Sequence, residues 1–474
     1  MKILFIASEA FPLAKVGGLA DVTSSLAMAL YDLGHEPCLI LPRYKSIKAP
    51  VQEIEGKDFS FDFMGHHEQI ALAMTVLKDK VPVYLVENDA FFGTGEIYGQ
   101  DELERFYFFS SVVPAIISRL RVEPDIVHFH DWHTALGPLW LKESKSSLPC
   151  LFTMHNVAYQ GTFDHEFFAR SGLSSLWQKY TPADAPRAPL SFMSQGILLA
   201  DILTTVSPTY SSEILTAEYG EGLEPLLNYR RDDLYGIING IDYNEYNPAT
   251  DPYIQTRYDS SAVERRADNK LAVQRETGLP EDIEAPLFGI VSRLDEQKGI
   301  DLLLLAIDPF IEETGAQLVI LGEGREYYHR SLIEAASKHP GRLSVTIARD
   351  EGLARLIYAG SDMFLMPSRF EPCGLGQLIA MRYGAVPVVR RTGGLIDTVH
   401  DVAEDNGNGF VFRNHAAAEM LEAVKRAEAS FHSRGEWQNL IERNMKLDFS
   451  WNRSARKYEE VYLRARNVAQ VRQS

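Results

Sequence analysis

Residues 1–30 read MKILFIASEAFPLAKVGGLADVTSSLAMAL. The apolar run at residues 3–7 is short and nearly continuous, which is typical of a parallel strand buried on both faces. Residues 19–30 carry apolar side chains at positions 19, 22, 26, 29 and 30, the spacing of a helix with one buried face. Gly17 and Gly18 stand between the two segments and favour a tight turn. This order of strand, turn and helix predicts the opening unit of a parallel α/β sheet.

The same alternation continues along the chain. In the first half we expect further strands at residues 37–41, 126–129, 151–154 and 203–206. In the second half we expect strands at residues 287–291, 316–321, 344–347, 363–366 and 386–389, with helices at residues 301–309 and 375–383. The pattern therefore predicts two Rossmann-like, doubly wound sheets, whose ligands bind outside the carboxyl ends of the strands.

A domain crossing is expected at residues 244–261, where prolines, tyrosines and scattered acids interrupt the alternation. The predicted first domain spans residues 1–243 and the second spans residues 244–451. The two domains are either unrelated Rossmann-like units or a facing pair with a central cleft between the carboxyl ends of both sheets. We favour the facing pair and expect it to close on a ligand. The last forty or so residues are charged and have a helical pattern.

Composition limits the possible functions. The chain has 474 residues, which favours two or three domains, and a net charge of −18. An acidic surface repels phosphate backbones and anionic lipid, so we expect neither nucleic acid nor membrane as a partner. The three cysteines are widely spaced without a CxxC pair, which favours a reducing cytoplasm over a disulfide framework or a zinc site. The apolar start is too short for a signal sequence, and no run approaches the ~20 apolar residues of a membrane span.

Several segments whose side chains could bind a ligand or take part in a reaction follow predicted strands of the first half. Lys15 adds a cation to a helix N-terminus that favours anions, and Asp21 could accept hydrogen bonds from sugar hydroxyls; a plain Gly-Gly turn is the alternative. The segment HFHDWH at residues 128–133 could bind metal through His128, His130 and His133, could offer Trp132 to a sugar ring, or could be packed aromatics. His155 and Asn156 also follow a strand, and no Ser or Cys elbow supports a hydrolase triad.

The second half has three such segments. Arg293 and Lys298 form a plausible diphosphate clamp, although both could pair with Asp295 and Glu296 instead. Residues 369–377 place Glu371 and a glycine turn before a helix, where backbone N–H groups can bind phosphate or ribose. Cys373 in this segment favours packing over nucleophilic chemistry. A second glycine loop with two cations occupies residues 390–395.

These segments occur together in a fixed order. They are KVGGLADV (15–22), DWH (131–133), HNVAYQG (155–161), SRL with KG (292–294, 298–299), RFEPCGL (369–375) and TGGL (392–395). Over nearly its whole length the chain closely resembles bacterial glycogen synthases and plant starch synthases, which are retaining, ADP-glucose-using glycosyltransferases. The resemblance implies an α/β GT-B fold, and a final helix, residues 452–474, that crosses back to complete the first domain.

The resemblance also implies a role for individual residues. The implied catalytic residues are His155, Arg293, Lys298 and Glu371. The implied donor-binding residues are Lys15, Gly17, Gly18, Asp21, Arg293, Lys298, Gly374, Leu375, Gly376, Thr392, Gly393 and Gly394. The implied acceptor-binding residues are Glu9, Asp131, Trp132, His133, Asn156 and Gln160. The substrates would be ADP-glucose and an α-1,4-glucan, with no metal and no other cofactor.

Alternatives remain at this point. The chain could use UDP-glucose, could act on a small phosphorylated sugar, or could be a non-catalytic glucan-binding paralogue. The presence of Lys15, Arg293, Lys298 and Glu371 favours an enzyme. For the retained configuration we favour attack from the face that the nucleotide leaves, rather than a covalent glucosyl intermediate. A glucosyl adduct trapped on Asp21 or Glu371 would contradict that preference. The sequence predicts neither the oligomeric state nor the choice between glycogen and a starch-like product.

Overall fold

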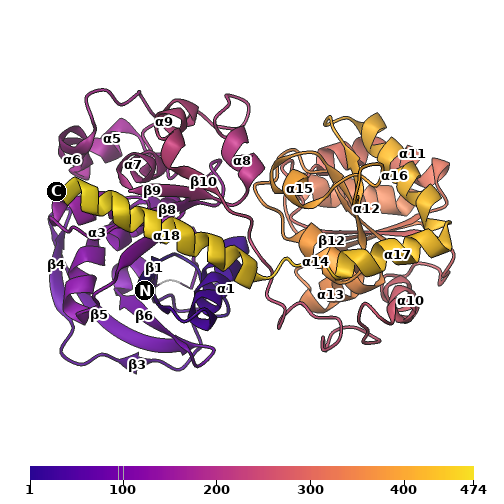
Figure 1. The fold of residues 1–474 in the computed structure, drawn as a ribbon, viewed down its shortest axis with the longest axis horizontal. Helices are drawn as coiled ribbons and strands as arrows, with labels where there is room; N and C mark the ends of the chain where they lie inside the picture. Colours follow the sequence, from indigo (N-terminus) through magenta and orange to yellow (C-terminus); the bar gives the residue numbers. More distant parts are fainter. Residues whose placement is uncertain (94, 100, 474) are drawn as a thin grey trace. The chain divides into compact units, whose positions relative to one another are not determined.

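The computed structural model describes residues 1–93, 95–99 and 101–473, and over these residues the chain forms two compact units (Figure 1). The first unit runs from Met1 to Asn239 and includes the helix that begins at Trp451. The second unit is Gly240–Ser450. No helix within the described residues has the length and apolar character needed to cross a membrane.

The sheet of the first unit is mainly parallel. Its strands are β1 (Lys2–Ile6), β2 (Glu36–Pro42), β3 (Gln52–Glu53), β4 (Phe59–Phe63), β5 (His66–Leu77), β6 (Val81–Glu87), β7 (Ile126–His130), β8 (Cys150–Met154), β9 (Ile202–Thr205) and β10 (Leu234–Gly236). They are ordered β10-β9-β8-β7-β1-β2-β6-β5-β3, with β4 paired to β5. Pairing is parallel from β10 to β6 and antiparallel where β5 meets β6, β3 and β4.

Helices of the first unit include the last helix of the chain. They are α1 (Gly18–Asp32), α2 (Asp89–Phe92), α3 (Glu102–Leu120), α4 (Gly137–Glu143), α5 (His165–Arg170), α6 (Leu173–Tyr180), α7 (Phe192–Leu199), α8 (Pro208–Glu213), α9 (Glu224–Tyr229) and α18 (Trp451–Gln473), with short 3-10 turns η1 (Trp132–Thr134) and η2 (Arg231–Asp233). Helix α18 lies along this unit (Figure 1) and contacts α1. It buries Trp451, Tyr458 and Tyr462 in the core that also holds Phe5. The predicted return of the C-terminal helix is therefore confirmed.

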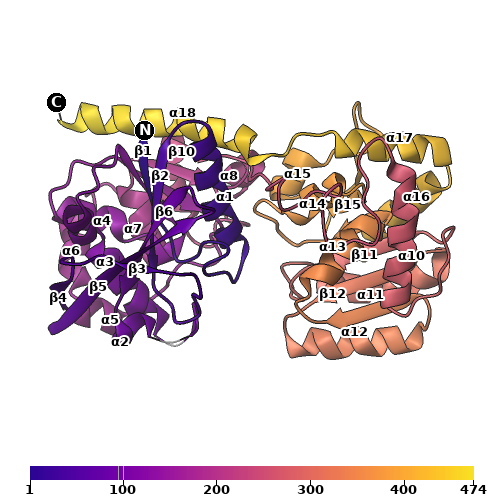
Figure 2. The same ribbon diagram turned by 90° about the horizontal axis from the view of Figure 1, so that it is seen from below.

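The second unit is a parallel sheet with helices on both faces (Figure 2). Its strands, in the order β13-β12-β11-β14-β15-β16, are β11 (Leu287–Val291), β12 (Gln317–Gly322), β13 (Leu343–Ile347), β14 (Met363–Met366), β15 (Val386–Arg390) and β16 (Phe410–Phe412). Its helices are α10 (Arg266–Glu276), α11 (Ile300–Glu313), α12 (Glu326–Lys338), α13 (Glu351–Gly360), α14 (Gly376–Arg382), α15 (Gly393–Thr398), α16 (Ala417–Phe431) and α17 (Arg434–Met445), with the 3-10 turn η3 (Val263–Arg265). Phe288 belongs to the core cluster of α11 and α12, whereas its neighbour Leu287 belongs to that of α10 and α13. This alternation is what a doubly wound sheet requires.

Each predicted strand is present, within one residue at either end for most of them, and the helices predicted at 19–30, 301–309 and 375–383 are α1, α11 and α14. Most of these strands, such as β1 and β11, are buried on both faces and have continuous apolar runs, whereas the edge strand β13 is mostly half-buried. The strands β6, β10 and β16 were not predicted, and neither were the antiparallel strands β3 to β5. The middle one, β4, alternates buried and exposed residues over only five positions, which is a weak signal.

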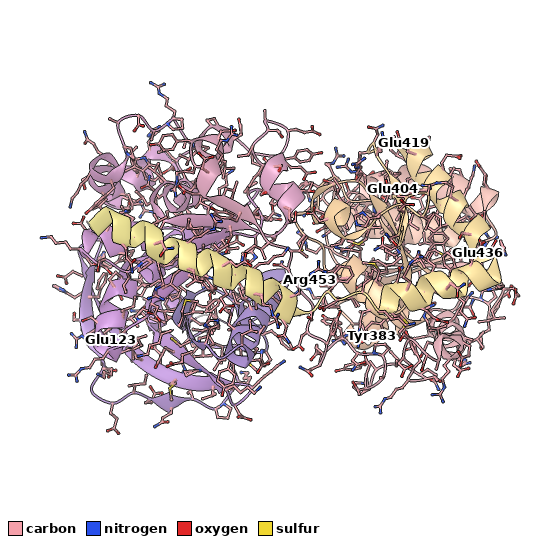
Figure 3. All side chains as sticks on the ribbon, in the orientation of Figure 1. Glu123, Tyr383, Glu404, Glu419, Glu436 and Arg453 are labelled. Atoms are coloured by element: carbon pink, nitrogen blue, oxygen red, sulfur yellow. The ribbon has the colours of Figure 1, made fainter. Side chains whose placement is uncertain are left out.

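The crossing between the units lies at Asn239–Gly240 and again at Ser450–Trp451. Residues 244–261, where the sequence predicted it, belong to the second unit and anchor its surface. Ile254 and Tyr258 are buried in the core of that unit. The carboxylate of Asp251 is buried and pairs with Arg355 at 3.4 Å, and it also accepts a hydrogen bond from Tyr383 (labelled in Figure 3). Prolines, tyrosines and acids here mark an anchored loop rather than a linker.

Candidate active site

In the first unit, three loops emerge at one edge of the sheet because three neighbouring strands run in parallel. Phe5 of β1 pairs with His128 of β7, and His130 of β7 pairs with Thr153 of β8. The segments that follow these strands therefore leave from the carboxyl edge, where such sheets bind ligands. Those segments hold all the catalytic, donor-binding and acceptor-binding residues that the resemblance implies for this unit.

Glu9 organises the loop after β1. Its side chain is buried, and one carboxylate oxygen accepts the backbone N–H groups of Val16 at 2.6 Å and of Gly17 at 3.0 Å. The other oxygen accepts a hydrogen bond from the Tyr98 hydroxyl. A carboxylate with three donors holds the Val16–Gly17 turn in one shape. In the structure, Glu9 therefore stabilises the loop that follows β1. Direct contact between Glu9 and an acceptor sugar stays a prediction.

Lys15 and Asp21 face each other across the start of α1. Lys15 Nζ lies 2.8 Å from Asp21 Oδ1, and the two side chains are 37% and 23% exposed. Gly17 precedes α1 with φ −132°, a conformation open to any residue, and a Cβ at this position would meet nothing within 4 Å. Neither backbone strain nor packing within the chain thus demands glycine here. Open space beside a helix N-terminus and a lysine can admit an anion.

Asp131 connects the ends of β7 and β8. It has φ +57°, and its Oδ1 accepts the backbone N–H of His155 at 2.9 Å. Burial raises the pKa of Asp131 to about 7. A left-handed conformation at a non-glycine residue costs energy and is often found at functional sites.

Trp132 is packed rather than exposed. It is 7% exposed, its ring meets Phe106 edge-on at 5.3 Å, and a Cβ on Gly161 would come within 2.3 Å of it. His133 is also buried and stacks on Tyr98 at 4.9 Å between ring centroids. Of the two alternatives for this tryptophan, the structure shows the packed aromatic. Contacts of Trp132 and His133 with an acceptor remain predictions.

The histidines of β7 lead into the site. His128 bonds Thr153 Oγ1 at 2.6 Å and Tyr462 of α18 at 2.9 Å. His130 Nδ1 lies 3.0 Å from Nε2 of His155. Burial lowers the pKa of His155 to about 3, so its ring is neutral at pH 7. Within the described part of the chain, no three His, Cys, Asp or Glu side chains gather as a metal site would need.

The turn after His155 is held by one hydrogen bond within the turn and by one to a distant segment. Asn156 Oδ1 accepts the backbone N–H of Ala158 at 3.1 Å. Gln160 Nε2 donates to the carbonyl of Glu221 at 2.9 Å. Both side chains are half-buried, whereas Tyr159 between them is 51% exposed. The turn thus presents its polar side chains partly to solvent, close to the end of β8.

In the second unit, the loop after β11 carries the predicted clamp. Arg293 pairs with Asp295 at 2.9 Å and donates to Gln297 at 2.8 Å. Its side chain is half exposed, so the guanidinium remains accessible to a ligand. Asp295 also accepts the backbone N–H of Lys298 at 3.0 Å. The sequence left open whether Arg293 and Lys298 pair with Asp295 and Glu296. Arg293 does pair with Asp295, whereas Glu296 pairs with Arg325.

Lys298 and Glu371, 73 positions apart, form an ion pair. Lys298 Nζ lies 2.6 Å from Glu371 Oε2, and Ser368 Oγ donates to the same oxygen at 3.0 Å. The two ionic side chains are 18% and 5% exposed. A pair this well shielded from water holds each charge in a fixed position. The structure thereby brings together two of the predicted catalytic residues.

Two glycine loops pack beside this pair. Gly374 has φ +72°, which favours glycine, and Gly376 begins α14 next to Leu375. The backbone N–H of Gly394 donates to the Glu371 carbonyl at 3.0 Å, and a Cβ on Gly394 would lie 2.2 Å from the carbonyl oxygen of Cys373. Glycine at 394 is therefore required by this close approach.

The remaining residues of these loops are enclosed. Thr392 is fully buried before Gly393, and Cys373 is buried, as a packing residue would be. Arg390 donates to the backbone carbonyls of Ser368 and Arg369, so this cation supports the loop instead of facing a ligand. The second glycine loop thus stabilises the Glu371 segment through hydrogen bonds to its backbone carbonyls.

Sequence reasoning missed some residues of these sites. Tyr98, which bonds Glu9, belongs to an irregular segment whose sequence gives no signal of its partner. Ser368 precedes the motif around Glu371 by three positions and could have been found as a strand-end hydroxyl. His130 was considered only as a metal ligand, whereas its contact is with His155.

A cavity of about 600 Å³ lies elsewhere on the first unit. Residues of β4, α3 and α4 line it, among them Phe61, Ser118 and Trp140. None of the sequence-predicted site residues belongs to its lining.

Comparison with known proteins matches the chain along its length. The starch synthase catalytic domain family matches residues 2–229, and the glycosyl transferases group 1 family matches residues 285–429. Glycogen synthase 1 of Synechocystis sp. is 43% identical over 473 residues, covering 98% of this chain and 94% of that protein. The glycogen synthase of Exiguobacterium sibiricum is 44% identical over 481 residues, covering 98% of each.

Solved structures give the same picture. The catalytic domain of starch synthase IV from Arabidopsis thaliana, bound to ADP and acarbose, has a TM-score of 0.91 and 34% identity, covering 98% of this chain and 99% of that one. A sucrose-phosphate synthase from Thermosynechococcus elongatus, 17% identical with a TM-score of 0.63 and 98% coverage of both chains, shares the fold. The predicted GT-B fold is confirmed.

Proposed function

The chain belongs to the family of bacterial glycogen synthases and plant starch synthases, and we propose that it lengthens an α-1,4-glucan by transferring glucose from ADP-glucose to the non-reducing end. The observation that carries this proposal is the extent of the similarity. Relatives named glycogen synthase are 43% and 44% identical over 98% of the chain. Lys15, Arg293, Lys298 and Glu371, which the family resemblance marks as functional, are all present.

The donor would be held chiefly by cations, because its diphosphate is anionic and the chain as a whole is acidic. Arg293 offers a half-exposed planar fork and Lys298 a point charge held by Glu371. In transfer, the bond from C1 of glucose to the diphosphate oxygen breaks and negative charge grows on the leaving ADP. Cations fixed beside that oxygen stabilise the transition state without further reorganisation. The relative solved with bound ADP supports an adenosine diphosphate at this type of site.

The acceptor step follows from the retained configuration. We favour attack of the glucan 4-hydroxyl on C1 from the face that ADP leaves, with the hydroxyl proton passing to the departing phosphate oxygen. No covalent glucosyl intermediate is then needed. His155 is neutral at pH 7, because burial lowers its pKa to about 3. It would therefore contribute a hydrogen bond to the sugar rather than a proton.

The remaining acceptor residues, Glu9, Asp131, Trp132, His133, Asn156 and Gln160, come from the first unit, and we assign them to the glucan side on family resemblance. Glu9 and Asp131 would act through the backbone turns that they hold. The proposed compartment is the cytoplasm, since the relatives named here include bacterial glycogen synthases and the three dispersed cysteines suit a reducing environment.

One assay tests the proposal. The protein is incubated with ADP-glucose or UDP-glucose and a maltooligosaccharide, and both nucleotide release and chain length are measured. We expect ADP release coupled to chains longer by single glucose units, with slower reaction from UDP-glucose. Faster reaction from UDP-glucose would contradict the donor assignment. Absence of nucleotide release in the presence of glucan would favour the non-catalytic paralogue.

A further inference from the structure

His130 has an environment with few options for hydrogen bonding. Its side chain is fully buried in β7; its ring stacks on Phe5 at 5.5 Å between centroids and contacts the tilted ring of His128 at 3.9 Å. Its Nδ1 lies 3.0 Å from Nε2 of His155. Its other nitrogen, Nε2, is buried and has no hydrogen-bond partner within the described chain. One contact, to His155, therefore accounts for the polar interactions of this ring.

The unpartnered nitrogen decides which tautomer is stable. A neutral imidazole carries one N–H and one lone pair. A buried N–H without an acceptor is rarer and more costly than a buried lone pair without a donor. The lone pair of His130 is therefore at Nε2 and its proton at Nδ1. Because burial lowers the pKa of His130 well below the usual value, the doubly protonated ring does not compete at neutral pH.

The proton on His130 then determines the state of its partner. His130 Nδ1–H donates to Nε2 of His155, so that nitrogen must carry a lone pair. The proton of the neutral His155 ring is consequently on Nδ1. The neighbouring polar groups do not offer His155 Nε2 another hydrogen-bond partner. Asp131 binds the backbone N–H of His155, and His128 is engaged with Thr153 and Tyr462.

We propose that His130 is a positioning residue that fixes His155 as its Nδ1-protonated tautomer, so that His155 presents a hydrogen-bond donor to an oxygen atom of the bound sugar. The identity of the sugar ligand rests on the proposed function. The tautomer and its cause do not, because both are properties of the free protein. The N–H at His155 Nδ1 donates to a lone pair of the sugar oxygen. Because this nitrogen already carries a proton, it cannot act as the base of the reaction.

Nitrogen NMR of the free protein tests the tautomer directly. The histidine rings are labelled with ¹⁵N at pH 7, and the His155 signals are identified by their loss in His155→Gln. In the wild type we expect His155 to be neutral with its proton on Nδ1. Protonation at Nε2, or an equal mixture of the two tautomers, would overturn the proposal whether or not the protein transfers glucose.

Two substitutions at position 130 separate hydrogen bonding from packing. In His130→Asn the side-chain amide can place an N–H near the position of Nδ1, whereas His130→Leu fills space without a donor. We expect His155 to keep its tautomer in the asparagine variant and to lose the preference in the leucine variant. His128→Leu is the matched control, since it removes a neighbouring buried imidazole that does not bond His155, and it should leave the His155 signals in the same tautomer. An unchanged tautomer in His130→Leu would contradict the positioning role.

Kinetics give a second readout. We expect kcat of His130→Leu to fall about ten- to hundredfold, with little change in KM for the nucleotide sugar, and His130→Asn to recover most of that loss. Equal losses in both variants would show a packing role and overturn the proposal. If the leucine variant does not fold, the wild-type tautomer and the asparagine variant still decide the question. If the wild-type protein does not transfer glucose, the proposed function is wrong, whereas the proposal for the His155 tautomer still stands or falls on the NMR result.

Discussion

At the scale of single residues, the buried carboxylate of Glu371 is the most constrained charge of the second unit's candidate site. Lys298 and Ser368 both contact one of its oxygens, at 2.6 Å and 3.0 Å. Removal of one ion leaves the other in a poorly solvated position, so activity and stability can both respond. Measurements on these residues must therefore separate the two effects.

We predict that Lys298→Ala and Glu371→Ala each lower kcat by about a hundredfold or more, because both groups act on the charge that develops in the transition state. The measurement is the initial rate of ADP release at saturating ADP-glucose. Thermal unfolding of each variant shows the folded fraction under assay conditions.

Lys338→Ala is the matched control for the lysine substitution. Lys338 is an exposed residue of α12 that pairs with Glu334, and its removal should leave the rate unchanged. Near-normal turnover in either Lys298→Ala or Glu371→Ala would show that these residues are misassigned.

Gly17 offers a test of the donor loop that is independent of stability. Its backbone conformation suits any residue and a Cβ would find open space, so Gly17→Ala should leave the unfolding temperature unchanged. We predict a severalfold rise in KM for ADP-glucose, because the methyl group would occupy space needed by the donor. An unaltered KM would mean that the donor does not approach this backbone. A lower unfolding temperature would mean that the loop, not the ligand, requires glycine.

At the scale of elements, the ends of β7 and β8 are joined through Asp131. Burial raises the pKa of this carboxyl from 3.8 to about 7. The folded protein therefore favours the neutral acid, and this contribution to stability is present at low pH and is lost as the pH rises towards 7. The backbone N–H of His155 binds Oδ1, which an asparagine would retain.

We predict that Asp131→Asn removes this pH dependence. The difference in unfolding free energy, wild type minus variant, should decrease between pH 4 and pH 7 by on the order of 1–4 kcal/mol and stay constant above pH 8. Urea unfolding at intervals across this range measures it. A difference that is constant throughout, or that increases with pH, would contradict the raised pKa.

The helices and strands also show which parts of the fold can be predicted from sequence patterns. Most of the parallel strands could be predicted because burial on both faces makes their apolar runs continuous, as in β1 and β11. The parallel strands β6, β10 and β16 were not predicted. The antiparallel strands near β5 could not be predicted, since their pairing depends on partners distant along the chain. Residues 244–261 have the composition of a linker, yet Ile254 and Tyr258 are buried, because single apolar side chains anchor the loop without any periodicity.

The candidate site follows the same rule. The place of His155 and Arg293 just after a strand could be predicted, since parallel strands direct their following loops to one edge, whereas their roles stay predictions. The pairing of Lys298 with Glu371 could not be inferred from spacing, because it joins segments 73 positions apart. The sequence left two alternatives for Trp132, a packed or a sugar-binding ring, and could not decide between them because its contacts, Phe106 and Gly161, come from other segments.

At the scale of the whole molecule, the chain completes its first unit only with its last helix. α18 belongs to the core of that unit, although the second unit separates it from the rest of the first unit in sequence. Trp451 is 5% exposed in this core, whereas Leu463 on the same helix is 48% exposed. Stability of the first unit therefore depends on residues far from it in sequence.

We predict that Trp451→Ala lowers the unfolding free energy of the first unit by about 3–5 kcal/mol, through the lost burial and the cavity left behind. Leu463→Ala on the exposed face should change it by less than about 0.5 kcal/mol. Denaturant unfolding followed by circular dichroism measures both. Similar effects of the two substitutions would show that α18 does not belong to this core in solution.

The most direct test of the whole account follows one glucose from donor to product. The protein is given ADP-glucose labelled with ¹³C at C1 and a maltooligosaccharide, and NMR reads the configuration and linkage of the labelled residue in the product. The account predicts that every labelled glucose in the product is α-1,4-linked and was added at the non-reducing end, with one ADP formed per glucose transferred. A β-linked product, a different linkage, or label released only as free glucose would contradict it.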